Sequence, residues 1–318
     1  MKWSSANHLG SDQHCAFRIG QFVIAMLLWS GCVFSASLSH GAELKKDTLT
    51  YWDAYVDNAR PVTNSQTIFL WVDQKPERAK RVREGEILVS PAGKETPKPV
   101  SSGLIHDWMG AAFLPNAKVE DVLSAVRDYG SYKDYYKPTV VDSRLLSRSE
   151  SCENYSMRVV NKEVVGETAL DMEYQTCYFK INELRWYSIT HTTRVQELQH
   201  YGQSDQQALP PDHGSGFIWR IYSIARYEQR DGGTYVEVEA IALSRDIPVA
   251  VRWMVNPIVR RLSRNSMLLS LQQTRDAVRL SEAANQASKS STNAATSSQG
   301  TSPSDRATVK DSAAGGRP

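Results

Sequence analysis

The chain has 318 residues, a formal net charge of +2 and 23% charged side chains. The chain is nearly neutral and has no long run of basic residues. A nucleic-acid partner is therefore not expected, because such proteins usually carry a basic surface. Once the two unusual ends are set aside, the length fits one large domain with a sizeable core.

Residues 1–42 have the layout of a secretory signal peptide. Basic residues precede an apolar run over 22–34, and small residues follow up to Ala42. Because the run is short for a membrane span, we expect cleavage near Ala42 and a periplasmic or secreted protein. The alternatives are an uncleaved membrane anchor and a lipoprotein, since Trp29-Ser-Gly-Cys32 resembles a lipobox with Trp in place of the usual Leu.

Residues 43–102 are interpreted as an N-terminal extension and linker. Residues 48–60 are predicted to form a helix with Trp52, Tyr55 and Val56 on one side, and residues 86–90 a short strand. Residues 91–102 are interpreted as a linker that contains Pro and Lys. We expect the extension to pack on the main domain rather than to fold by itself.

The main domain is expected over residues 103–284. A strand over 104–114 is followed by two short helical segments. Six more strands are then predicted, at 139–148, 152–161, 169–181, 184–199, 216–230 and 234–245. No helix is predicted between these six strands, so the sheet should be antiparallel. Asp231-Gly232-Gly233 is a strong hairpin signal between the last two.

A long amphipathic helix is predicted from about Pro257 to about Ala284, with a kink or a short lead-in before it. Residues 285–318 are almost without large apolar side chains. Such a segment cannot bury enough surface to offset the entropy of ordering, so disorder is expected there.

Only Cys152 and Cys177 remain once the signal peptide is removed. If the hairpin between their strands is centred between Val164 and Val165, the two cysteines face each other, within disulfide reach in an oxidising compartment. The alternative is a pair of buried free thiols. Two cysteines without a close histidine partner lack the ligand count for a metal site, so no metal or other cofactor is expected.

The order of a strand, two short helices, six strands and one long C-terminal helix is that of the helix-grip fold. Residues 103–108, 216–220 and 243–248 resemble segments of secreted bacterial members of the START-like, or SRPBCC, superfamily of polyketide cyclases and lipid-transport proteins. The resemblance implies an α+β helix-grip fold, in which a curved antiparallel sheet of about seven strands wraps around the C-terminal helix. It also implies a hydrophobic cavity for ligands such as lipids, sterols, polyketides or isoprenoids. It does not select one activity, because the superfamily holds carriers, cyclases and hydrolases.

One face of the last hairpin is expected to line such a cavity. With Arg230 opposite Gly233, strand alternation makes this face apolar and small at its centre, where Ser223, Ala240 and Ala242 leave space. The alternative is that leucines of the helix fill that space. The opposite face of the hairpin is expected to be solvated or ion-paired.

The expected ligand-binding residues come from this face, from the helix and from a polar or aromatic fringe. They are Trp219, Ile221, Ser223, Ala240, Ala242, Leu268, Leu271, His106, Trp108, Trp186 and Arg194. For the fringe residues the ordinary alternative is a core or surface role without a ligand.

No hydrolase, metalloprotease, phosphate-loop or dinucleotide motif is found in the sequence, and no catalytic residue is assigned. His106 and Asp107 are adjacent on a strand and point to opposite faces, which weakens them as a catalytic pair. We therefore expect non-catalytic binding or carriage of a hydrophobic small molecule in the bacterial cell envelope, with transient membrane contact. The alternatives are a cyclase-like or hydrolytic enzyme that uses His106, His191 or Arg194, and an envelope scaffold whose sheet is filled in.

Overall fold

The computed structural model describes residues 41–59, 68–93, 95–161 and 168–298, with side chains as far as residue 283. Residues 1–40 lie outside the described residues, so the signal peptide stays a prediction. Residues 299–318 also lie outside them. The first described residues already belong to the fold, because Ala42 pairs with Gly214 in a two-stranded sheet.

The helices and strands of the main domain follow one another in the expected order. The helical segments are α2 (Lys46–Ala59), η1 (Trp71–Gln74), α3 (Pro76–Arg83), α4 (Val119–Val126), η2 (Tyr129–Ser131), α5 (Tyr132–Tyr135) and α6 (Val249–Ser298). The strands are β1 (Ala42–Glu43), β2 (Leu88–Pro91), β3 (Lys98–Val100), β4 (Gly103–Pro115), β5 (Val140–Arg148), β6 (Cys152–Asn161), β7 (Thr168–Asn182), β8 (Arg185–Gln199), β9 (Gln207–Ala208), β10 (His213–Gly214), β11 (Arg220–Arg230) and β12 (Gly233–Arg245).

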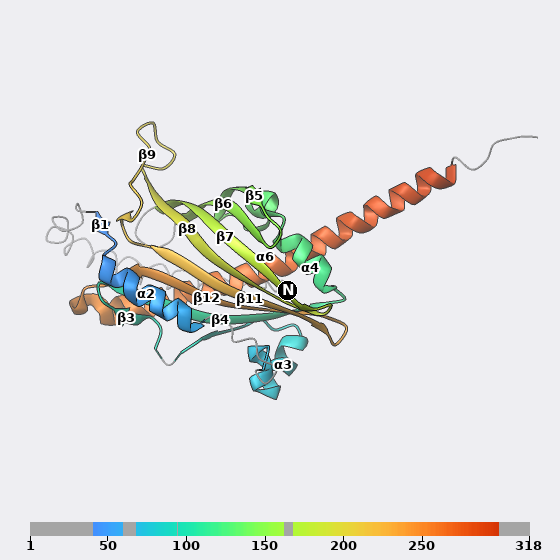
Figure 1. Ribbon diagram of the computed structural model, residues 1–318, viewed down its shortest axis with the longest axis horizontal. Coiled ribbons are helices and arrows are strands. Elements are labelled where there is room, and N and C mark those ends of the chain that lie inside the picture. The colour runs from blue at the N-terminus through green and yellow to red at the C-terminus, as the bar shows by residue number, and fades with distance from the viewer. Residues whose placement is uncertain (1–40, 60–67, 94, 162–167, 299–318) are drawn as a thin grey trace, which may run out of the picture.

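One large antiparallel sheet of ten strands forms the centre of the molecule. Its strand order is β2-β4-β12-β11-β8-β7-β6-β5, with β3 also paired to β4 and β9 to β8. The seven long strands are those predicted from the sequence, and α6 crosses behind them in Figure 1. The α+β helix-grip fold is confirmed.

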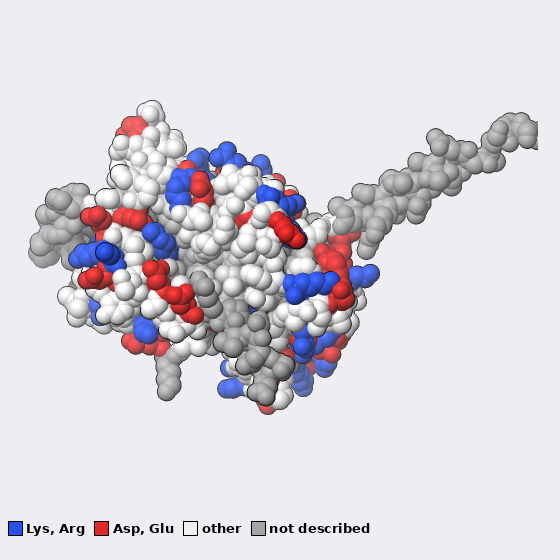
Figure 2. Space-filling view, in the orientation of Figure 1, with Lys and Arg blue, Asp and Glu red and all other residues white. Residues whose placement is uncertain are grey.

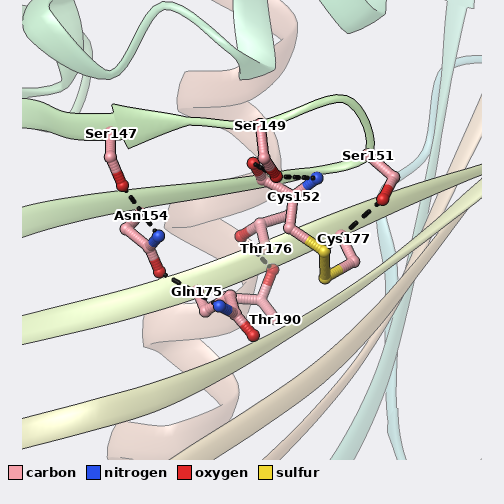
Figure 3. Close-up of a disulfide and its surroundings, with 9 residues drawn as sticks. All are labelled: Ser147, Ser149, Ser151, Cys152, Asn154, Gln175, Thr176, Cys177 and Thr190. Carbon is pink, nitrogen blue, oxygen red and sulfur yellow. Dashed lines mark hydrogen bonds between the residues drawn. A yellow bond between two sulfur atoms is a disulfide. The ribbon is translucent and has the colours of Figure 1, made fainter.

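Both registers inferred from the sequence are confirmed. Arg230 lies opposite Gly233 in the β11–β12 hairpin. Cys152 lies opposite Cys177 across β6 and β7, and the two form a disulfide. Figure 3 shows that the bond joins adjacent strands, with the Ser149 hydroxyl donating to the Cys152 carbonyl at 2.7 Å.

The N-terminal extension covers one face of the sheet, which we call the outer face. Trp52 and Val56 of α2 pack into a cluster with Ile224 and Ile241 of the hairpin. Farther along the sheet, Leu70, Val72 and Val82 pack on Phe113 and Tyr235, and all of them are buried. In Figure 1, α2 and α3 lie on the viewer's side of the sheet.

The expectation that this face is solvated was wrong. The carboxylate of Glu237 is 1% exposed and accepts the backbone N–H groups of Trp71 at 2.8 Å and Val72 at 3.2 Å. The expected ion pairs are present, because Arg226 lies 3.7 Å from both Glu237 and Glu239. The sequence predicts these charges, whereas the segment that covers them lies far away in the chain. Figure 2 shows acidic and basic groups interspersed on this side of the molecule.

The opposite side, which we call the inner face, carries α4, η2, α5 and α6. Helix α6 begins at Val249, before the expected start at Pro257, and it includes Pro257 within the helix. It continues to Ser298, into the segment that was expected to be disordered, and its end projects away from the sheet in Figure 1.

Candidate ligand-binding face

The inner face of the β11–β12 hairpin is apolar but incompletely covered. On the outer face, Tyr222, Ile224, Ile241 and Leu243 are all buried. Their alternating neighbours on the inner face are each only partly buried, namely Ile221, Ser223, Ala225, Val238, Ala240 and Ala242. These residues lie in the middle of a ten-stranded sheet, where side chains are normally covered. Small residues at the centre leave the inner face open.

Helix α6 closes the inner face at one end only. A side chain at Gly110 of β4 would lie 2.6 Å from Leu271 and 3.0 Å from Met267, so helix and sheet touch there. The next turn of the helix meets α5, where the Tyr136 and Thr274 hydroxyls lie 2.9 Å apart. Leu271 therefore fills space at this end, as the alternative interpretation expected, while Leu268 is partly buried.

The N-terminal part of α6 does not seal the face. Among residues 249–266 none is buried, and the first buried residue of the helix is Met267. The open stretch of the helix and the partly exposed hairpin residues thus belong to the same side of the sheet.

Stacked tyrosines fill the inner face at its β6–β7 side. The rings of Tyr129 and Tyr155 lie 4.1 Å apart, and those of Tyr155 and Tyr174 lie 5.0 Å apart, in both cases nearly parallel. Burial raises the pKa of Tyr174 well above the ordinary value. The tyrosines are neutral at physiological pH and form an apolar wall next to Ile221. The sequence showed an aromatic-rich segment here without showing that the rings stack.

Two polar side chains of β4 face the inner side without a full set of partners. His106 is 7% exposed, and its Nε2 lies 2.9 Å from the Ser244 hydroxyl. Neither His106 Nδ1 nor Trp108 Nε1 has a hydrogen-bond partner among the described residues. Burial lowers the pKa of His106 to about 4, so the ring is neutral at pH 7. A buried polar atom without a partner costs about 1–3 kcal/mol, and a bound molecule can remove that cost.

His106 and Asp107 point to opposite faces, as expected from strand alternation. Asp107 lies under α2 and accepts a hydrogen bond from the Tyr55 hydroxyl at 2.8 Å. Burial raises the pKa of this carboxyl. The two residues do not form a catalytic pair.

Two of the expected ligand-binding residues lie on the outer side instead. Trp219 packs in the α2 cluster, because β11 starts only at Arg220 and the alternation of the hairpin does not extend back to it. Arg194 pairs with Glu173 at 2.7 Å. Its neighbour Val195 lies in the tyrosine cluster, so strand alternation turns Arg194 outward.

The remaining expected residues lie on the inner side. Trp186 and Ala240 contact the cluster that contains Met267 and Leu271. Ser223 pairs with Ala240 and Ile221 pairs with Ala242 in the confirmed register, so these residues share the inner face. His191 pairs in register with Tyr222 of the outer face. No set of three or more His, Cys, Asp and Glu side chains in the described ranges is arranged to hold a metal.

Two surface hollows are bordered by residues other than those of the hairpin. One, of about 280 Å³, is bordered by Trp71, Arg78 and Arg264 among others. The other, of about 50 Å³, lies among charged residues of β5, β6 and β7. The larger one has a mainly polar border, unlike the hairpin.

No family model and no curated protein matches the chain. Several solved structures match the chain. A STAR-related lipid transfer protein of Xanthomonas axonopodis is 19% identical, with 60% of this chain and 98% of that chain covered and a TM-score of 0.40. Human STARD10 is 9% identical, with 69% and 84% covered and a TM-score of 0.37. The Zhui aromatase/cyclase of a Streptomyces species is 12% identical, with 55% and 94% covered and a TM-score of 0.36.

The fold of the chain is the helix-grip fold. The order of elements that indicated this resemblance from the sequence is the order in the structure. None of the described helices is long and apolar enough to cross a membrane.

Proposed function

We propose that this protein binds and carries a hydrophobic small molecule, held on the inner face of the β11–β12 hairpin beside the end that α6 leaves unsealed. The observation that supports this proposal is the partial exposure of the small residues Ser223, Ala240 and Ala242 at the centre of the sheet. Covering apolar surface gains about 25 cal/mol per Å², so a guest that completes this layer needs few polar contacts to bind.

The polar end of the guest is best placed at His106 and Trp108. The Ser244 hydroxyl donates to the Arg245 carbonyl at 3.2 Å, which leaves its oxygen to accept from His106 Nε2. His106 Nδ1 is then an acceptor, whereas the indole N–H of Trp108 is a donor. A hydroxyl group can donate to the first and accept from the second. We therefore propose an apolar alcohol as the preferred class of guest.

The proposed place of action is the cell envelope. The Cys152–Cys177 disulfide supports an oxidising compartment, because such bonds persist outside the cytoplasm. A carrier of apolar cargo must load and release it where that cargo is soluble, so transient contact with a membrane belongs to the proposed function.

Binding of cis-parinaric acid, a fluorescent apolar probe, tests the proposal. Wild-type protein should give saturable binding, and Ala240→Phe and Ala242→Phe should each weaken it at least about tenfold, because the ring occupies the space for the guest. Ala208→Phe is the matched control, since Ala208 is exposed on β9. Absence of saturable binding to the wild type, or equal binding by the Ala240 variant and the control, would refute the proposal.

A second candidate function is hydrolysis of the bound molecule. The hydrogen bond between His106 and Ser244 favours it in the other tautomer of His106, in which Nε2 carries no proton and can take the proton of the serine hydroxyl. In that case His106→Asn should abolish hydrolysis of p-nitrophenyl decanoate while binding of cis-parinaric acid persists. If the wild type does not hydrolyse this ester faster than Ser244→Ala, the pair serves binding alone.

A further inference from the structure

The start of α6 exposes large apolar side chains to solvent. Trp253 is 78% exposed, Val249 75%, Ile258 51% and Met254 44%. We call these four residues the apolar end of α6. They lie within three turns on the exposed half of a single helix, with the exposed Ala250 and Pro257 between them, so they form one patch rather than scattered exposures. A contiguous exposed apolar patch of this kind marks an interaction site.

Arginines follow the apolar end directly. Arg260, Arg261 and Arg264 are all exposed, and we call them the basic turn. Along α6 no acidic residue occurs before Asp276. Arg260 donates to the backbone carbonyl of Thr96. Neither Arg261 nor Arg264 has an acidic side chain within 4.0 Å in the part of the chain that the structure describes. The basic turn therefore keeps its charge available to an anionic partner.

The apolar end and the basic turn lie on the same half of α6. With 3.6 residues per turn, all seven side chains fall on one half of the helix, the half whose residues are exposed. Amphipathic helices lie in the plane of the interface and bury apolar side chains about 5–10 Å deep, at the boundary of headgroups and acyl chains. With α6 in that orientation the apolar end reaches this boundary, the long arginine side chains reach the phosphates, and Trp253 has the amphipathic ring that favours this interface.

We propose that the apolar end and the basic turn of α6 form a docking site for an anionic lipid bilayer. A protein partner would need its own apolar surface and its own acids at matched positions, whereas a bilayer supplies both layers at the required depths. The proposal rests on the proposed function for its purpose, since docking brings the guest-binding face to a membrane. Its residues are separate from those that line the face.

The docking site also lies at the open end of the inner face. Ser244, which bonds to His106, precedes Val249 by five residues. No residue of α6 before Met267 is buried. A bilayer bound at the apolar end is thus next to the part of the inner face that α6 leaves unsealed, and a guest could pass between the two with a short exposure to water.

Flotation with lipid vesicles tests the docking site. Exported protein, recovered in soluble form, is mixed with vesicles of phosphatidylcholine and phosphatidylglycerol at about 7:3. Trp253→Ser combined with Ile258→Ser should weaken binding at least about tenfold, because the inserted apolar surface is lost. Arg261→Gln and Arg264→Gln should each weaken it about fivefold, and only on the anionic vesicles. Leu280→Ser, a change at a 64% exposed leucine of the same helix, should have no effect.

The outcomes separate the docking site from the guest-binding face. The Trp253 variant should still bind cis-parinaric acid, and Ala240→Phe should still float with vesicles. If wild-type protein stays at the bottom of the gradient, or if the Leu280 control loses as much binding as the Trp253 variant, the docking site is refuted. If sedimentation instead shows a dimer that Trp253→Ser dissociates, the apolar end is an interface between copies and the bilayer proposal fails.

Discussion

The two faces of the β11–β12 hairpin differ in how completely they are covered. On the outer face Ile224 and Ile241 are 0% exposed, because α2 covers them. On the inner face their neighbours Ser223 and Ala240 remain partly exposed, although α6 lies on that side. The same two strands therefore have one face completed by the chain itself and one face left incomplete. Stability should depend on the first and binding on the second.

The comparison also explains why the N-terminal extension is present. Its helical part occupies the outer face with buried residues, whereas Ile87 and Val89 of the strand that follows pack against the cluster around Met267 and Leu271. A helical segment on the outer face contacts neither Ser223 and Ala240 on the inner face nor the exposed start of α6. The extension is thus expected to stabilise the fold without gating the guest.

The largest expected effect is on the outer face. Ile241→Ala should lower the free energy of unfolding by about 4 kcal/mol, because Ile241 is 0% exposed and its removal leaves a cavity. Affinity for cis-parinaric acid should not change. Urea unfolding measures the loss, and Ile258→Ala at a 51% exposed site should stay within about 0.5 kcal/mol of wild type. A large loss of affinity in the Ile241 variant would show that the two faces are coupled.

The disulfide should matter next. Replacing Cys152 and Cys177 by Ser should cost about 3 kcal/mol, since the bond closes a loop with a sequence separation of 25. Ser151→Ala, beside the bond, serves as the control. Thiol labelling of denatured, unreduced protein should find neither cysteine reactive. Labelling of both would show that the compartment does not oxidise them.

A pH dependence should come from the outer face. Burial raises the pKa of Glu237 from 4.5 to about 7, so folding favours the protonated carboxyl. The stability this group contributes is present below about pH 4.5 and is lost as the pH rises through about 7. Relative to Glu237→Gln, wild type should lose on the order of 2–3 kcal/mol over that window. Glu120→Gln, at an exposed position on α4, is the control, and identical pH profiles for wild type and Glu237→Gln would contradict the prediction.

The smallest expected effect belongs to the inner face. Wild type should bind 1-dodecanol about fivefold more tightly than dodecyl methyl ether, because only the alcohol can donate to His106 Nδ1. His106→Phe should remove that preference while leaving ether binding in place. Competition with cis-parinaric acid measures both affinities. An equal preference in wild type and variant would remove His106 from the site.

Much of the frame could be predicted from the sequence because it depends on local rules. Strand alternation and the Asp231-Gly232 turn predicted the Arg230–Gly233 register, and the spacing of the cysteines predicted their pairing. Both are properties of single hairpins, where a turn determines the register of the two strands beside it.

What the sequence did not predict depends on contacts between distant segments. The covering of Glu237 by residues 71 and 72 joins positions about 165 apart in the chain, and no local pattern indicates it. The outward position of Trp219 depends on where β11 begins, and strand boundaries are less well specified by sequence than strand centres. The early start of α6 was missed because Pro257 reads as a first helical residue, whereas here the helix continues through it.

Gly110 sets the distance between α6 and the sheet at their point of contact. Because Leu271 and Met267 rest directly on its backbone, this one position determines how closely the helix approaches the sheet. An alanine there would act as a spacer, lifting the helix at its contact point and enlarging the compartment beneath it. The size of cargo that such a protein accepts could therefore be changed at a residue that never touches the cargo.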